Sequence, residues 1–161
     1  MSGLSEKRLF LLDMDGTIYL DEQLFDGVPD FLRTVREKGG RYLFLTNNSS
    51  RGVEGYIEKM HRLGIETGPE DFLTSVDATV RHLKNHLPGK RCYVFGTRSF
   101  CDQLESAGIP VTTDREDGVE VLLCGFDTEL TFQKLEDACI LLNRGAEWIA
   151  TNPDWVCPTW Y

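Results

Sequence analysis

The sequence has few basic residues for its length and no long apolar run. Its 17 Lys and Arg are outnumbered by 26 Asp and Glu, which gives a formal net charge of -9. Contacts with nucleic-acid phosphates need clustered Lys and Arg, so this balance excludes nucleic acid as a main partner. No apolar stretch approaches the roughly 20 residues of a membrane-spanning helix, so we also predict no membrane partner.

Cysteine pairs and export signals are missing as well. The five cysteines are an odd number, and none of them forms a CxxC pair. The opening stretch MSGLSEKRLF lacks the apolar core of a secretory signal. We therefore expect a cytoplasmic protein with reduced thiols, in which each Cys serves as a small buried hydrophobic residue.

What the sequence does contain is a regular alternation of strand and helix patterns. The first half reads as strand, helix, strand, helix, and then a short strand with a helix, at residues 8–13, 26–40, 41–48, 49–65 and 73–87. Ser49 or Ser50 is the expected N-cap of the helix over 49–65. This order predicts an α/β fold with a doubly wound parallel sheet.

The pattern restarts after Pro88-Gly89, which indicates a domain boundary at 88/89. The second half again alternates strand and helix, at residues 91–96, 99–108, 119–126, 131–145 and 147–152. The expected buried face of the helix over 131–145 is made of Phe132, Leu135, Ala138, Cys139 and Leu142. Residues 1–88 and 89–161 therefore form two α/β units in this prediction.

Two polar clusters stand where predicted strands end. Asp13 and Asp15 follow the apolar run LFLL, with Gly16 next, and Thr46, Asn47 and Asn48 end the strand over 41–48. Ligands of open α/β sheets bind outside the carboxyl ends of the strands. Adjacent parallel strands would bring both clusters within reach of one ligand.

The two carboxylates suit a metal-assisted reaction. Close carboxylates repel each other, and a hard divalent cation such as Mg²⁺ relieves that repulsion. One ionised carboxylate can attack an electrophile while the other acts as general acid and then base. Gly16 permits a sharp turn whose backbone N–H groups can bind a phosphate. Neutral donors at Thr46, Asn47 and Asn48 suit the same phosphate group. A calcium loop is excluded because its twelfth position, which requires Glu, is Leu24.

The stretches LLDMDGTIY, LFLTNNSSRG and IATNPD, in this order, resemble the haloacid dehalogenase superfamily of phosphatases. The similarity is closest to its class IIA branch, which includes nitrophenylphosphatases and sugar- or pyridoxal-phosphate phosphatases. The resemblance implies a Rossmann-like core, with 1–88 as its N-terminal part, and an α/β cap from 89 to 161. It further implies a small phosphorylated metabolite as substrate and, because members of this branch often pair through the cap, a homodimer.

The same resemblance assigns roles to individual residues. Asp13 matches the nucleophile that forms an aspartyl-phosphate, and Asp15 matches the acid/base. Asp13 through its carboxylate and Asp15 through its backbone carbonyl would ligate Mg²⁺. Thr46, helped by Asn47, matches the group that holds the phosphoryl oxygen. In the cap, Asn152 and Asp154 fall in a stretch that resembles the substrate-facing region.

The chain departs from the family pattern in one respect. A Lys after the cap and an acidic GDxxxTD-type loop, the third and fourth family motifs, do not occur in the 161 residues. We therefore expect the chain to stop inside the cap. We also expect the sheet to be short on one side of the Asp13 strand, with apolar surface left uncovered.

Three alternatives to a phosphatase remain open at this point. A non-catalytic binding or dimerisation protein derived from the same fold would also fit the sequence. A response-regulator receiver fits poorly, since its phosphorylated Asp ends the third strand, whereas the strand over 41–48 ends in Thr-Asn-Asn. A phosphomutase of the same superfamily would carry a small helical cap, unlike the α/β pattern of 89–161.

Overall fold

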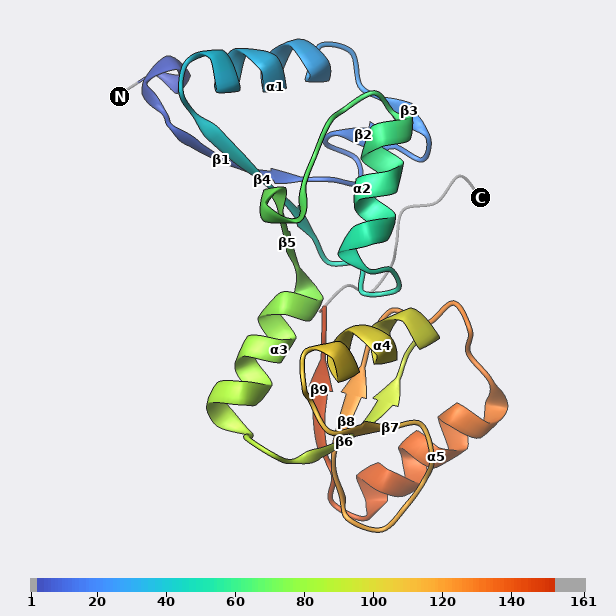
Figure 1. The fold of residues 1–161 in the computed structure, drawn as a ribbon. Helices are drawn as coiled ribbons and strands as arrows, with labels where there is room; N and C mark the ends of the chain where they lie inside the picture. The colour runs from blue at the N-terminus through green and yellow to red at the C-terminus, as the bar shows by residue number, and fades with distance from the viewer. Residues whose placement is uncertain (1–2, 153–161) are drawn as a thin grey trace. The chain divides into compact units, whose positions relative to one another are not determined.

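The computed structural model describes residues 3–152, which form two compact units (Figure 1). Unit 1 holds the chain up to Thr46 together with Val53–Thr74, and unit 2 holds Asn47–Gly52 together with the chain from Ser75 onward. This division differs from the 88/89 boundary expected from the sequence. The helix that follows Thr74 buries Val76 and Leu83 in the apolar core of unit 2, which is why it belongs there.

Unit 1 is built on a three-stranded parallel sheet in the order β1-β4-β5. Its strands are β1 (Leu9–Asp13), β4 (Arg41–Thr46) and β5 (Phe72–Thr74). Its helices are α1 (Val28–Glu37) and α2 (Val53–Arg62), with short 3-10 turns η1 (Leu4–Glu6) and η2 (Pro69–Asp71). A small antiparallel hairpin of β2 (Tyr19–Leu20) and β3 (Gln23–Leu24), which the sequence pattern did not predict, follows β1.

One face of this sheet is covered and the other is open. Helices α1 and α2 pack over the face that carries Tyr42, Phe44 and Phe72, and Phe44 is fully buried. On the opposite face Leu9 and Leu11 remain 56% and 59% exposed. β1 is also an edge strand among the described residues. The uncovered apolar surface expected beside the Asp13 strand is therefore present.

Unit 2 is a four-stranded parallel sheet in the order β7-β6-β8-β9. Its strands are β6 (Arg91–Phe95), β7 (Val111–Thr112), β8 (Val119–Cys124) and β9 (Glu147–Ala150). Helices α3 (Ser75–His86) and α4 (Arg98–Ser106) cover one face and α5 (Phe132–Asn143) covers the other (Figure 1). The predicted α/β fold with parallel sheets is confirmed.

The predicted buried face of α5 was wrong. Asp137, Ala138 and Leu141 face the sheet, whereas Phe132 is 82% exposed and Leu135 is 47% exposed. Cys139 and Leu142 are exposed as well. Of the five residues expected in the core, only Ala138 is buried, so the more apolar side of α5 points outward.

A polar network explains this orientation. Asp137 is 5% exposed, and its carboxylate pairs with Arg115 at 3.0 Å and accepts from the hydroxyl of Tyr93 at 3.4 Å. Gln133 donates to the same carboxylate at 3.0 Å. Burial, and then the nearby Asp137 carboxylate, raise the pKa of Tyr93 to about 12. A buried charge that is fully hydrogen-bonded can replace apolar contacts at this face.

The cysteines within residues 3–152 are free thiols, as expected, but only some of them are buried. Cys92, Cys101, Cys124 and Cys139 are unpaired. Cys92 and Cys101 are buried, and burial raises the pKa of the Cys92 thiol to about 11. Cys139 lies exposed on α5 and does not serve as a buried hydrophobic residue.

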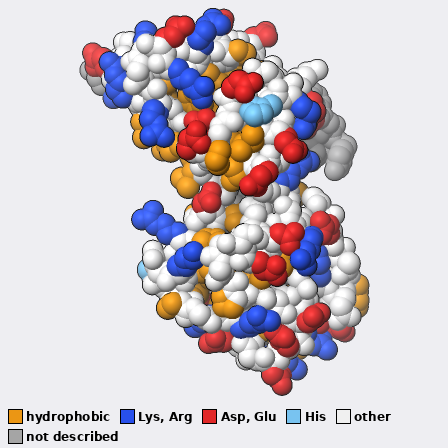
Figure 2. Space-filling model, in the orientation of Figure 1, with side chains coloured by type: hydrophobic (Ala, Val, Ile, Leu, Met, Phe, Trp, Pro, Cys, Tyr) orange, Lys and Arg blue, Asp and Glu red, His pale blue; other side chains and the backbone are white. Residues whose placement is uncertain are grey.

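The surface of each unit carries mixed charge. Figure 2 shows Lys and Arg side chains interspersed with Asp and Glu over the visible face of both units. Among residues 3–152, no helix has both the length and the apolar composition needed to cross a bilayer.

The two separate cores lead to a prediction about local stability. Phe44→Ala should destabilise unit 1 by about 3–5 kcal/mol, because it empties a fully buried ring site. Hydrogen exchange should then accelerate in β1, β4 and β5 but not in β6 and β8. Leu123→Ala, at a fully buried position of unit 2, should give the converse pattern. Equal acceleration in all strands for both variants would show that the units do not have independent cores.

Candidate active site

The carboxyl end of β1 presents two exposed acids on either side of a buried residue. Asp13 closes the strand and Asp15 lies two residues on, and both are exposed. Between them Met14 is fully buried in the core of unit 1. Because Met14 points inward, both of its neighbours point away from the core. The alternation of side chains along an extended chain predicts this arrangement.

A tight turn follows the two acids and is held by backbone hydrogen bonds. The Met14 carbonyl accepts from the N–H groups of Thr17 at 3.2 Å and Ile18 at 2.9 Å. Gly16 donates its N–H to the Tyr19 carbonyl at 2.8 Å and has a φ of +79°. The donor that we expected Gly16 to offer to a phosphate is therefore engaged within the turn. The positive φ of Gly16 is what lets the backbone reverse here.

The hairpin β2–β3 is fastened to α2 by a buried cation. Lys59 is 8% exposed, and its Nζ lies 3.6 Å from the centroid of the Tyr19 ring. Such a contact between an ammonium group and an aromatic face stabilises by about 1–2 kcal/mol when it is desolvated. Sequence reasoning missed Lys59. Its position on the same helical face as the buried Tyr56 and Met60 was the available signal.

The end of β4 supplies a buried hydroxyl. Thr46 is 5% exposed, and its Oγ1 donates to the hydroxyl of Tyr56 on α2 at 3.3 Å. Tyr56 is itself 3% exposed, and its ring stacks near Phe72 with centroids 6.2 Å apart. The Thr46 side chain is thus held by α2 as well as by its strand.

The parallel register brings Asp13 and Thr46 to the same edge of the sheet. Asp13 is paired with Leu45, so Thr46 lies one residue further along the neighbouring strand. The two side chains begin on opposite faces, since Asp13 shares the open face with Leu11 and Thr46 shares the covered face with Phe44. A ligand that reaches both must therefore lie beyond the strand ends and not over either face.

Asn47 and Asn48 belong to unit 2. The Asn47 carbonyl accepts from the Ser75 hydroxyl at 3.0 Å and from the Asn152 amide at 3.4 Å. The side-chain oxygen of Asn48 accepts from the N–H of Ser50 at 2.9 Å and from its hydroxyl at 2.7 Å. Asn48 therefore shapes a local turn, and Asn47 is exposed beside it.

The structure shows where the residues expected to cap helix α2 lie, and it also shows one of the two residues expected to face the substrate. Helix α2 begins at Val53, so Ser49 and Ser50 lie before it and the prediction that one of them is its N-cap was wrong. Asn152 lies at the described end of unit 2, where it contacts Asn47. The prediction for Asp154 falls outside the described residues.

The family model for haloacid dehalogenase-like hydrolases matches residues 10–110, which include both strand-end clusters. The chain belongs to the haloacid dehalogenase-like hydrolases. Within this family it falls in the class IIA branch, as the sequence predicted. Relatives in that branch are named as phosphatases of several kinds.

Three of these relatives show the extent of the similarity. The chain is 32% identical, over 94% of its length, to an acid sugar phosphatase of Staphylococcus aureus. The crystal structure of a 4-nitrophenylphosphatase from Thermotoga maritima matches 97% of the chain with 38% identity and a TM-score of 0.89. A glycerol phosphate phosphatase from Mycobacterium tuberculosis, solved in complex with magnesium, matches 99% of the chain with 27% identity and a TM-score of 0.87.

The chain is shorter than each of these relatives. It spans 58% of the acid sugar phosphatase, 59% of the nitrophenylphosphatase and 49% of the glycerol phosphate phosphatase. The similarity covers nearly all of this chain's own residues, and it therefore establishes the family to which the chain belongs.

The turn after the two acids yields a prediction about strain. Gly16→Ala should lower the stability of unit 1 by about 1–2 kcal/mol, because a side chain disfavours a positive φ even where space is open. Gly39→Ala is the matched control, since Gly39 has a φ of +69° and open space but follows α1. Urea unfolding should give similar losses for both. An unchanged free energy of unfolding for Gly16→Ala would contradict the prediction that a side chain strains this turn.

Proposed function

We propose that this hydrolase is a phosphomonoester phosphatase that acts on a small phosphorylated metabolite through an aspartyl-phosphate. The observation that carries the proposal is the exposed Asp13 at the end of β1, next in register to the strand that ends in Thr46. The names of the relatives, which include acid sugar, nitrophenyl and glycerol phosphate phosphatases, support the same chemistry. Unit 1 corresponds in this proposal to part of the catalytic core, and unit 2 to the cap.

The residues at the end of β1 suit a magnesium ion. Asp13 and Asp15 offer hard oxygen donors that are open to solvent. Within residues 3–152, no group of three or more His, Cys, Asp or Glu side chains is close enough to form a metal site by itself. Mg²⁺ is commonly held by only one or two carboxylates, with water and substrate phosphate completing its shell. The donor set therefore fits, with the Asp13 carboxylate and the Asp15 backbone carbonyl as ligands, so the Asp15 side chain need not bind the ion and can carry a proton.

The bound ion would supply positive charge that offsets the repulsion between the carboxylates and the phosphoryl oxygens. Asp13 Oδ attacks the phosphorus atom, forming one P–O bond as the bond to the leaving oxygen breaks. Asp15, in its protonated form, gives its proton to that oxygen, which leaves as an alcohol. Ionised Asp15 then takes a proton from water, and the resulting attack on phosphorus releases phosphate and restores Asp13.

The hydroxyl pair at the end of β4 can serve the phosphoryl group without any charged residue. Thr46 Oγ1 donates to the Tyr56 hydroxyl in the structure. A hydroxyl can rotate, so Tyr56 can instead donate to Thr46 while the Thr46 proton turns to a phosphoryl oxygen. Asn47 and Asn48 are proposed to extend this neutral binding surface, and Gly16 contributes by shaping the turn. In the cap, Asn152 and Asp154 are proposed to face the substrate.

If Asp13 is the nucleophile, a substitution that preserves the size of its side chain should cause a large loss of phosphatase activity. Asp13→Asn keeps the size of the side chain but removes the nucleophilic oxygen, so turnover of 4-nitrophenyl phosphate with Mg²⁺ should fall about a thousandfold or more. Asp15→Asn should let a phosphorylated protein accumulate, detectable as a mass increase, because water is no longer activated.

Asp21→Asn provides the matched control. Asp21 lies in the turn of the β2–β3 hairpin, and Asn tolerates its φ of +50°. This variant should retain activity and should exclude a simple effect of lost negative charge. The assay should use both the 161-residue chain and any longer product of the same gene. Full activity of the Asp13→Asn form in either would show that Asp13 is not the nucleophile.

A second candidate function is association through unit 2, and one observation favours it. The outward side of α5 carries the exposed apolar residues Phe132, Leu135 and Leu142. Trp148, on the strand β9 that forms an edge of the sheet within residues 3–152, is 65% exposed. Exposed apolar groups of this kind mark interaction surfaces. We propose that they pair two copies of the chain, in the manner expected for a cap-mediated homodimer.

Sedimentation tests this association. The wild-type chain should sediment as a dimer, and Phe132→Ser with Leu135→Ser should make it a monomer with unchanged far-ultraviolet circular dichroism. Leu11→Ser is the control, because Leu11 is 59% exposed, between Leu135 at 47% and Phe132 at 82%, but lies on the open sheet face of unit 1. If only Leu11→Ser dissociates the dimer, the contact is through unit 1.

A further inference from the structure

The short segment Asn47–Gly52 is held by unit 2 through a buried hydroxyl. Ser49 is fully buried, although its side chain is polar. Its Oγ accepts from the N–H of Phe126 at 2.9 Å and lies 3.1 Å from the hydroxyl oxygen of Thr151. Phe126 follows β8 and Thr151 follows β9, so two strand ends of unit 2 meet at one serine.

Three more hydrogen bonds hold the same segment. Thr97, after β6, donates its hydroxyl to the Ser50 carbonyl at 3.1 Å. Ser75 at the start of α3 and Asn152 after β9 both donate to the Asn47 carbonyl. The donors come from four places in unit 2, so the segment has no freedom to shift without breaking several bonds.

Gly125 makes room for the serine. A Cβ at this position would lie 2.8 Å from Ser49 Oγ, a distance that side-chain carbons do not adopt. The close approach of the β8 end to Ser49 therefore depends on glycine at 125.

The segment occupies the place where a parallel sheet of this topology usually binds a ligand. In the sheet order β7-β6-β8-β9, β7 lies on one side of β6 and β8 lies on the other side. The chain runs from β6 to β7 and then crosses over to β8. The carboxyl ends of β6 and β8 therefore border a topological switch point. Thr97 and Phe126 lie at those two ends and both bind the segment. The segment Asn47–Gly52 therefore lies at the topological switch point of the sheet in unit 2.

We propose that Ser49 is a positioning residue through which unit 2 fixes the backbone of Asn47 for phosphate binding. The proposal rests on the proposed phosphatase function. Within unit 2, Ser49 is held by Phe126 and Thr151, and the Asn47 carbonyl accepts from Ser75 and Asn152. Asn47 and Asn48 therefore have little freedom relative to unit 2, so these proposed phosphate-binding residues are ordered before the ligand arrives.

The sequence offered a weaker interpretation of Ser49, as the N-cap of the next helix. A helix cap would order α2 only, and its loss would change local helix stability. A residue that positions Asn47 must instead change phosphate affinity when it is altered. The two roles therefore differ in a measurable property.

The experiment compares hydrogen exchange of the peptide covering 47–52 with the affinity for inorganic phosphate in the presence of Mg²⁺. Ser49→Ala and Thr151→Val each remove one hydroxyl from the anchor, while Thr151→Ser keeps it. Thr112→Val is the matched control. Thr112 is a buried hydroxyl at the end of β7 that makes one donor and one acceptor contact, with Asp114.

Ser49→Ala and Thr151→Val should accelerate exchange in 47–52 and weaken phosphate binding, each about tenfold, the size expected for one lost buried hydrogen bond. Thr151→Ser should restore both values. Thr112→Val should change neither. The comparison among folded variants of Thr151 keeps the test decisive even if Ser49→Ala fails to fold.

Two results would overturn the proposal. One is unchanged exchange in 47–52 for both anchor variants, and the other is faster exchange with phosphate affinity equal to that of Thr112→Val. A wild-type protein that binds no phosphate would refute the phosphatase function. Faster exchange in the anchor variants would in that case still support Ser49 as the anchor of the segment, so the two failures are distinguishable.

Discussion

The parallel register of β1 and β4 is the constraint on which the candidate site depends. Leu9 pairs with Arg41 and Asp13 with Leu45, so both strands deliver their polar ends to the same edge. A slip of one residue would move the apolar side chains of β1 from one face of the sheet to the other. Burial of Phe44 between the sheet and its helices resists such a slip. The core of unit 1 therefore determines where Asp13 can act.

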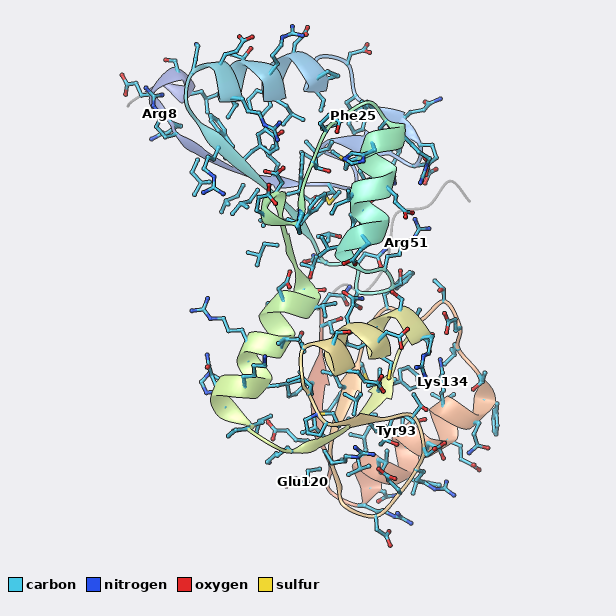
Figure 3. The ribbon with its side chains drawn as sticks, viewed as in Figure 1. Arg8, Phe25, Arg51, Tyr93, Glu120 and Lys134 are labelled. Carbon is cyan, nitrogen blue, oxygen red and sulfur yellow. The ribbon has the colours of Figure 1, made fainter. Side chains whose placement is uncertain are left out.

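Apart from the two exposed acids, the groups around this edge are neutral or already paired. Thr46 is bound to Tyr56, Gly16 is bound within its turn, and the buried Lys59 lies over Tyr19. Unit 2 follows a similar rule, since Lys134 on α5 (Figure 3) reaches the Gly96 carbonyl at 2.7 Å and the Asp127 carboxylate at 3.0 Å. Buried charges in both units are thus matched locally, which lets polar side chains occupy the ends of strands without a large desolvation cost.

Much of the fold could be predicted because its signals are local. Apolar runs such as LFLL and the helix pattern over residues 26–40 identified the larger elements within a few residues. The two-residue strands β2, β3 and β7 were missed because they contain too few residues to show a period. The buried face of α5 was predicted wrongly because apolar spacing favoured Phe132 and Leu135, whereas Arg115 and Tyr93 hold Asp137 against the sheet. Those partners are distant in the sequence, so no local pattern reveals them.

The sequence by itself determined the family, the strand that ends at Asp13 just before Asp15, and the polar residues that end the next strand. These features depend on short motifs and on residue order, which a linear chain displays directly. Only the tertiary structure decided that Asn47–Gly52 belongs to unit 2 and that Ser49 is buried between two strand ends instead of capping a helix. Its partners Phe126 and Thr151 lie 77 and 102 residues away. Hydrogen bonds over such separations exist only after the sheet of unit 2 has formed, and for that reason the sequence pattern could not show them.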